Sequence, residues 1–108
     1  MNIQYGTVEY FEASLPEYFQ YLVDHFFKIL PMKEQGEDTV YAYMDSLQFE
    51  LLGFSELFTD AKYSANVVTL LSILQRLIDK KDCKISVVRR EVFHAISICN
   101  KLIQAYSE

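Results

Sequence analysis

The sequence predicts an all-α protein, an antiparallel four-helix bundle-like domain with a short N-terminal arm. Apolar residues recur at spacings of three and four in four separate segments, which is typical of amphipathic helices. Only three Gly and two Pro occur in 108 residues, which favours long regular elements and short connections. Hydrophobic residues make up 51% of the chain, enough for one core. We therefore expect a single helical domain over residues 1–108, with helices at about 15–30, 39–58, 61–79 and 86–106.

The first helix has a recognisable start and end. Ser14 and Glu17 match a capping box, and Pro16 stands in the first turn, where its missing N–H costs little. Pro31 is expected to end the helix. The predicted buried stripe consists of Leu15, Tyr18, Phe19, Leu22, Val23, Phe26, Phe27 and Leu30.

The second helix has one purely apolar face. Its stripe is Val40, Met44, Leu47, Leu51, Phe54 and Phe58, spaced by four and three residues in turn. Gly53 lies inside this helix and is expected to weaken it by roughly 1 kcal/mol relative to Ala. We expect a kink or a close approach of another helix at Gly53.

The third and fourth helices complete the bundle. Thr59 or Asp60 is expected to cap the third and Ser86 the fourth. The third stripe is Tyr63, Val67, Leu70, Leu71, Leu74, Leu77 and Ile78, and the fourth is Val88, Val92, Ala95, Ile96, Cys99, Leu102, Ile103 and Tyr106. Short connections between four such helices favour antiparallel neighbours.

Compartment and membrane signals point to a cytoplasmic protein. The first thirteen residues lack the basic and apolar regions of a signal peptide. The most apolar run, VVTLLSIL, is far shorter than the roughly twenty residues of a membrane span. Cys99 falls on a core stripe and Cys83 in a polar connection, and both suit a reducing compartment. We expect no membrane association.

Charge divides the chain into two unlike halves. Residues 1–61 carry eleven acidic and two basic side chains, whereas residues 62–108 carry four and eight. Either the halves face each other and partly neutralise, or the acidic half presents a negative surface to a basic partner. The segment from Glu34 to Asp60 contains seven carboxylates and no Lys or Arg.

A second face of the helix at 39–58 combines rings with carboxylates. At about 100° per residue, Tyr41, Phe49 and Leu52 point away from the apolar stripe, in the sector that also holds Asp38, Asp45 and Glu56. Two interpretations stay open. Rings of the N-terminal arm (Tyr5, Tyr10 and Phe11) cover this face, or a protein partner binds it, since rings anchor interfaces and surrounding charges select the partner.

Metal and cofactor sites are not expected. Glu91 and His94 form one E-x-x-H pair, but a di-metal bundle needs two such pairs and two further glutamates. The other histidine, His25, follows Leu22 at that spacing and is expected to be solvated or to cap a helix. Three glycines leave no room for a phosphate-binding loop. The sequence pI near 5.0 argues against direct nucleic-acid binding.

One enzymatic alternative comes from the stretch Arg89 to His94. It resembles the R-x4-H motif of HEPN domains, all-helical RNases in which paired subunits bring two motifs together. The resemblance implies Arg89 and His94 as the catalytic pair, with Arg90 at the usually polar position after the Arg. On a regular helix these two residues are about 140° apart.

The acidic and aromatic character of the second helix supports a different function. In overall character the chain resembles bacterial immunity proteins of polymorphic and contact-dependent toxins, which are small, acidic and cytoplasmic. The resemblance implies a non-enzymatic inhibitor that neutralises a basic partner, such as a toxin nuclease domain. Monomer and dimer stay open, as does a homo-oligomeric helical adaptor. The residues that carry this resemblance are Glu34, Glu37, Asp38, Tyr41, Asp45, Glu50, Phe49, Leu52, Glu56 and Asp60, and all but Glu50 form the predicted partner-binding set.

Overall fold

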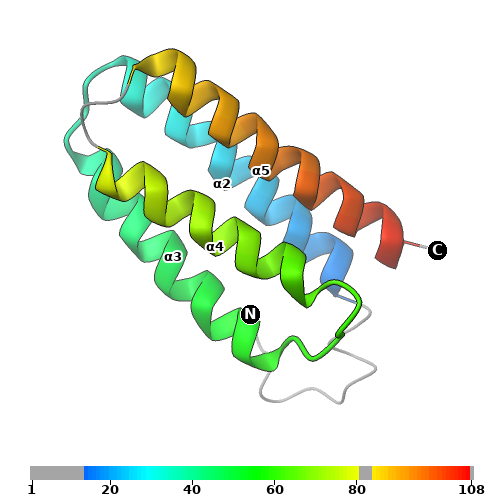
Figure 1. Ribbon diagram of the computed structural model, residues 1–108. Coiled ribbons are helices and arrows are strands. Elements are labelled where there is room, and N and C mark those ends of the chain that lie inside the picture. The colour runs from blue at the N-terminus through cyan, green and yellow to red at the C-terminus, as the bar shows by residue number, and fades with distance from the viewer. Residues whose placement is uncertain (1–13, 81–83, 108) are drawn as a thin grey trace.

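The computed structural model describes residues 14–80 and 84–107. This part of the chain forms four helices, α2 (Leu15–Glu34), α3 (Thr39–Leu57), α4 (Ser64–Asp79) and α5 (Ile85–Tyr106). Successive helices run in opposite directions (Figure 1), so the predicted all-α antiparallel bundle is confirmed. None of these helices is long and apolar enough to cross a membrane. The predicted N-terminal arm lies outside the described residues.

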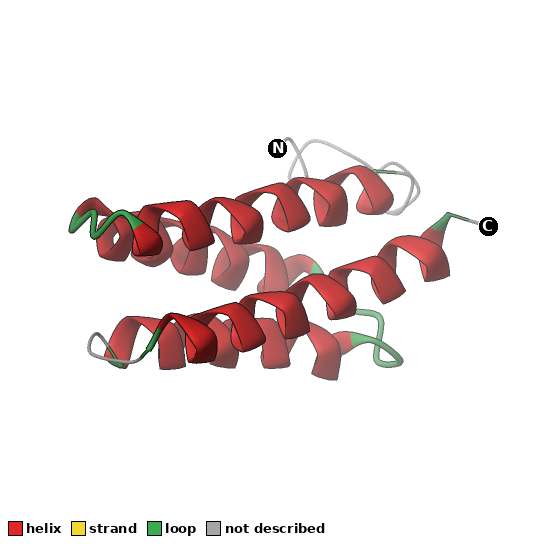
Figure 2. Ribbon diagram, turned by 90° about the horizontal axis from the view of Figure 1, so that it is seen from above, coloured by secondary structure: helices red, strands yellow, loops and turns green. Residues whose placement is uncertain are grey.

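Each helix packs against two others, so that the four surround one core. α2 contacts α3 and α5, and α4 also contacts α3 and α5, with the most extensive contact between α2 and α5. Figure 2 shows the helices lying alongside one another, with their connections at the two ends of the bundle. Between α2 and α3 the space is filled by large rings, such as Tyr18 and Phe54, whose centroids are 4.3 Å apart.

The core confirms the predicted stripes with two kinds of difference. All six stripe residues predicted for the second helix are buried, although α3 ends one residue before Phe58, and Cys99 is a buried free thiol as predicted. Phe27, expected in the core, is 45% exposed, whereas Ile29 is fully buried. Around the helix axis, Ile29 is about 60° from the buried Phe26, whereas Phe27 is about 100° from it on the other side. Phe27 therefore lies outside the buried sector of α2. Ile73 and Ile98 are also buried although the stripes omit them, whereas Tyr63, Leu71, Ile78, Ile103 and Tyr106 are only partly buried.

The expected end of the first helix at Pro31 is wrong. α2 continues through Pro31 to Glu34, and the N–H of Gln35 donates to the Pro31 carbonyl at 3.0 Å. Proline lacks its own N–H and its ring crowds the carbonyl one turn earlier, but the residues after Pro31 keep their N–H groups, so the following turn still forms. The helix ends instead at Glu34, two residues before Gly36, whose φ of 68° is the left-handed conformation of a Schellman motif. The N–H of Gly36 donates to the Lys33 carbonyl at 3.1 Å, and the N–H of Glu37 donates to the Met32 carbonyl at 3.0 Å.

The predicted helix starts are only partly right. Ser14 directly precedes α2, but its backbone is already helical and its side chain makes no capping bond. α4 begins at Ser64 rather than at 61, because Asp60 organises a turn: its side chain accepts the Lys62 N–H at 3.0 Å. Thr59 and Asp60 therefore do not cap α4. α5 begins at Ile85 after an extended residue, which leaves Ser86 inside the helix.

Gly53 does not mark a close helix approach. A Cβ placed on Gly53 would meet no atom of another element within 4 Å, and the residue is exposed on α3. Of the two expectations for Gly53, the close approach of another helix is therefore wrong, and the glycine is not required there by packing.

Candidate functional site

The outward side of α3 carries the ring with the highest exposed fraction among the large hydrophobic residues that the structure describes. Phe49 is 80% exposed and Leu52 is 49% exposed. Phe49 is two residues from each of the buried Leu47 and Leu51, hence about 200° from both around the helix. Exposed carboxylates flank it on the same side. We call Asp45, Phe49, Leu52 and Glu56 the acidic-aromatic face.

A groove runs beside this face, between α3 and α4. It encloses about 360 Å³ and is lined by Asp45, Gln48, Phe49, Leu52, Leu71 and Gln75. The Gln48 side-chain amide donates to the Gln75 side-chain oxygen at 2.9 Å, which links the two walls. Leu71 was predicted to lie in the core, so the α4 wall of the groove was not predicted from the sequence. The apolar run VVTLLSIL of α4 contains more apolar residues than one buried helix face needs. This surplus could have predicted an exposed apolar wall on α4.

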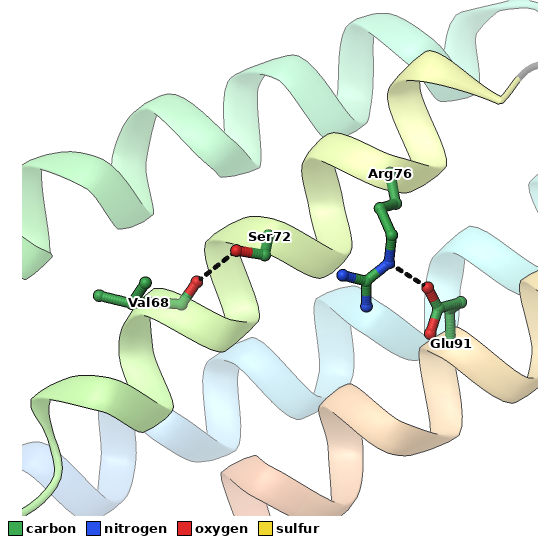
Figure 3. Close-up of polar contacts among 4 residues, drawn as sticks. All are labelled: Val68, Ser72, Arg76 and Glu91. Atoms are coloured by element: carbon green, nitrogen blue, oxygen red, sulfur yellow. Dashed lines mark hydrogen bonds and ion pairs between the residues drawn. The ribbon is translucent and has the colours of Figure 1, made fainter.

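One turn before Leu71 on α4, a further apolar side chain is exposed. Val68 is 58% exposed. Its carbonyl accepts the hydroxyl of Ser72 at 3.1 Å, so that hydroxyl is bonded to its own helix (Figure 3). Val68 therefore adds exposed apolar area to α4 without adding a charge.

No ion pair neutralises the carboxylates of this face within the described residues. The pairs found there are Arg76 with Glu91, at 2.6 Å, and Arg89 with Glu34, at 3.8 Å. Of these, only Arg89–Glu34 joins the acidic half of the chain to the basic half, and both side chains are about half exposed. Asp45 and Glu56 thus stay available to an outside cation.

The nine predicted partner-binding residues do not form one surface. α3 is 19 residues long, or about 28 Å. Glu34, Glu37 and Asp38 lie at the α2–α3 connection. Tyr41 is half-buried there, with the Lys33 ammonium 4.9 Å from its ring centroid. The acidic-aromatic face occupies the middle and later turns of α3, and Asp60 lies past its end.

Asp60 has a structural role in the α3–α4 turn. The Tyr106 hydroxyl at the end of α5 donates to its carboxylate, and the Lys62 N–H donates at 3.0 Å. These bonds lower the pKa of Asp60 from its usual value, the Tyr106 hydroxyl having the largest effect. We therefore remove Asp60 from the central binding set.

A second concave site lies on the other side of α3, facing α2, and sequence analysis missed it. It encloses about 110 Å³ and is lined by Tyr21, His25, Tyr43, Ser46, Leu47 and Glu50. We call it the tyrosine pocket. The hydroxyls of Tyr18 and Tyr21 donate to the two oxygens of Glu50, at 3.3 and 3.0 Å.

His25 was expected to be solvated or to cap a helix. It lines this pocket instead. Its Nδ1 is hydrogen-bonded to the Tyr43 hydroxyl, and its ring meets the Tyr21 ring edge to face at 4.2 Å. Burial, and then the charge of Lys28, lower the pKa of His25. Burial, with Glu50 nearby, raises the pKa of Tyr18 and of Tyr21.

The signal for this pocket was present but ambiguous. Tyr21 and His25 are four residues apart on α2, and Tyr43 and Glu50 are seven apart on α3. Both spacings place residues on one helix face. Which two faces meet depends on how α2 and α3 pack, which no local pattern specifies.

Arg89 and His94 lie on one continuous helix, α5, and both are exposed. Arg89 pairs with Glu34 of α2. Glu91 between them is bound by Arg76 of α4 (Figure 3), and this bond holds the pKa of Glu91 below its usual value. Within the described part, no group of three or more His, Cys, Asp or Glu side chains is placed to hold a metal ion.

Basic side chains gather at the α4–α5 end of the bundle. Arg76, Lys80 and Arg90 line a groove of about 240 Å³ together with Leu77, Val87 and Glu91. Arg76 is already bonded to Glu91, so this groove is less cationic than its residue types suggest.

Comparison with protein-family models, curated proteins and solved structures finds no match for this chain. Function is therefore inferred from the surfaces of α3 and α4 described above.

Proposed function

We propose that this protein is a non-enzymatic immunity or inhibitor protein that binds and neutralises a basic protein partner, such as a toxin nuclease domain. The binding surface is the acidic-aromatic face with the adjoining groove. The observation that carries the proposal is the 80% exposure of Phe49 between the carboxylates of Asp45 and Glu56. The bundle already buries its apolar stripes, so this exposed ring adds little to the stability of the unbound protein.

The apolar part of this surface supplies affinity. Burying a phenylalanine side chain against a partner contributes about 1.5–3 kcal/mol. Leu52 and Leu71 offer a hollow beside the ring, and rings next to hollows are typical anchors of protein interfaces. Gln48 and Gln75 supply uncharged polar groups at the same groove.

The charged part of this surface selects a basic partner. The chain from Glu34 to Asp60 contains no Lys or Arg, so a cationic surface meets no repulsion along α3. Proteins that act on nucleic acids carry basic grooves for phosphates. An acidic surface that occupies such a groove inhibits by exclusion, and complementary charge speeds association. A small, acidic, helical inhibitor of this kind resembles the immunity proteins of toxin systems.

Self-association is the alternative that the same exposed residues favour. Phe49, Leu52 and Val68 are three large apolar side chains on adjoining helices, and such surfaces also pair with their own copies. Sedimentation of the purified chain separates the two. A monomer at micromolar concentration supports a heterologous partner, and a dimer that Phe49→Asp dissociates supports an adaptor.

The inhibitor function is tested by activity. A partner captured on the immobilised chain is purified, and its enzymatic activity is titrated with the wild-type chain and with Phe49→Asp. The proposal predicts complete inhibition at one equivalent of wild type and at least a tenfold larger inhibition constant for Phe49→Asp. A captured partner that stays fully active when saturated with the chain contradicts inhibition.

A further inference from the structure

We propose that the tyrosine pocket between α2 and α3 is a binding site for a primary alkylammonium group. The proposal does not depend on the acidic-aromatic face, which lies on the opposite side of the α3 axis from α2. It assigns a ligand chemistry to residues that the partner-binding surface leaves unused: Tyr21, His25, Tyr43, Ser46 and Glu50.

The walls of the pocket are aromatic. Tyr21 and His25 are in edge contact at 4.2 Å, and His25 and Tyr43 are stacked at 5.6 Å. Tyr18 extends this row of rings, with its centroid 5.8 Å from that of Tyr21. Aromatic rings attract an ammonium ion through their electron-rich faces, and cages of several rings recognise such cations.

The polar groups of the pocket are suited to accept hydrogen bonds. Glu50 receives the hydroxyls of Tyr18 and Tyr21, and a carboxylate offers about four acceptor positions. Two positions are therefore left for a third and fourth donor. Ser46 adds a hydroxyl oxygen at the same pocket. An ammonium group has three N–H donors and no acceptor, which matches this set.

The negative charge of Glu50 has no cationic partner in the described part of the chain. The ion pairs found there involve Arg76 of α4 with Glu91 and Arg89 of α5 with Glu34, and neither includes Glu50. Burial lowers the pKa of His25, so its ring does not supply a positive charge near neutral pH. Lys28 and Asp24 act on His25 from α2 with opposite signs, and neither lines the pocket. A ligand cation would compensate Glu50.

The size of the pocket suits a small cationic group. It has a volume of about 110 Å³ and opens to solvent. That space accommodates an ammonium group with a short alkyl stem. Anions are disfavoured because Glu50 would repel them.

The test is a titration of the full chain with n-butylammonium chloride, followed by amide and ring NMR signals at constant ionic strength. The proposal predicts saturable shifts at Ser46, Glu50 and the ring of Tyr43, and no shifts at these positions with 1-butanol or butyrate. Equal shifts with 1-butanol, or no saturable shift with butylammonium, would overturn it. This comparison uses only the wild-type chain and does not depend on a variant folding.

A pair of variants separates the pocket from general surface charge. Glu50→Gln is expected to raise the Kd for butylammonium at least tenfold, because the amide keeps an acceptor for the tyrosines but loses the charge. Glu56→Gln removes a carboxylate from the outward side of the same helix and is expected to leave the Kd unchanged. Equal weakening by the two substitutions contradicts a localised site.

The ammonium can belong to a free amine or to a lysine side chain of another protein. A capped Gly-Lys-Gly peptide, compared with the same peptide containing norleucine, distinguishes the two. A lysine peptide that binds as tightly as butylammonium assigns the pocket to protein lysines, and a peptide at least tenfold weaker assigns it to free amines. Both results support an alkylammonium site, whereas equal binding of the norleucine peptide contradicts it.

Discussion

The Gln48 side chain on α3 and the Gln75 side chain on α4 are joined by a hydrogen bond of 2.9 Å. The two residues belong to opposite walls of the groove next to Phe49. Gln75 in turn donates to Asp79 one turn further along α4, at 2.9 Å. The groove is therefore held by side chains of the free protein, and a partner that uses it meets a preformed surface, which lowers the entropic cost of binding.

Phe49 and Phe54 are expected to contribute very differently to stability. Phe54 is 1% exposed, so Phe54→Ala leaves a cavity and should reduce the free energy of unfolding by about 3–5 kcal/mol. Phe49→Ala removes a ring that is mostly in water and should change it by less than about 0.5 kcal/mol. Urea unfolding followed by circular dichroism measures both. A loss above 2 kcal/mol for Phe49→Ala would mean that the ring is packed within the folded chain.

Substitution of the two described glycines by alanine is expected to have opposite signs. Gly36 has a φ of 68°, a conformation that costs an L-residue roughly 1–2 kcal/mol, so Gly36→Ala should be destabilising. Gly53 is helical and has open space at its Cβ position, so Gly53→Ala should stabilise by about 0.5–1 kcal/mol. Thermal unfolding of the two variants checks this. The same sign for both would argue against the helix end at Gly36.

The bond between Arg76 and Glu91 is expected to make stability depend on pH in the acid range. Arg76 lowers the pKa of Glu91 in the folded chain. The resulting stabilisation is present above the pKa of the unfolded carboxyl and is lost as pH falls through the folded value. Because the Arg76 side chain is 43% exposed, Arg76→Met should cost no more than about 1 kcal/mol at pH 7.

The readout for this pair is the free energy of unfolding as a function of pH. In Arg76→Met the decline below about pH 4.5, the region where free carboxyls titrate, should be shallower than in wild type. Lys101→Met removes an exposed charge from the same helix as Glu91 and serves as the control. If Lys101→Met reproduces the effect, general charge rather than the Arg76–Glu91 bond is responsible.

Cys99 is expected to be chemically inert in the folded protein. It is fully buried, and burial raises its pKa to about 12, so the reactive thiolate is scarce at pH 8. In a Cys83→Ser background, labelling of Cys99 by a disulfide reagent should require unfolding and should speed up with urea. Labelling at the rate of a free thiol in native buffer would contradict the packing of α5.

Local periodicity predicted much of the fold but little of its site geometry. The six core positions from Val40 to Phe58 follow from spacing alone, since one face of a helix is determined by the helix period. Phe27 was wrongly predicted to be buried, and Ile29 was left out of the stripe, because the buried sector of α2 depends on its contacts with both α3 and α5. Glu50 meets Tyr18 and Tyr21 across about thirty residues of chain, and such pairings arise from tertiary packing.

The helix ends were likewise predicted only in part. The sequence held the correct signal for the end of α2 in Gly36, but Pro31 five residues earlier is the more familiar stop. The position of Phe49 was predicted correctly from the helix period. Whether residues 1–13 cover part of α3 concerns a segment outside the described residues.

The most direct test of the proposed function is the affinity of the captured partner for Asp45→Lys/Glu56→Lys, measured by surface plasmon resonance at low and high salt. The matched control, Glu17→Lys/Asp24→Lys, makes the same change in net charge on exposed positions of α2. We predict that the α3 double variant loses binding while its circular dichroism and unfolding midpoint stay near wild type. The association rate of wild type should fall steeply with salt, because exposed charges are screened over about 10 Å at 0.1 M. Unchanged affinity of the α3 variant, or an equal loss in the α2 control, would contradict binding through the acidic-aromatic face.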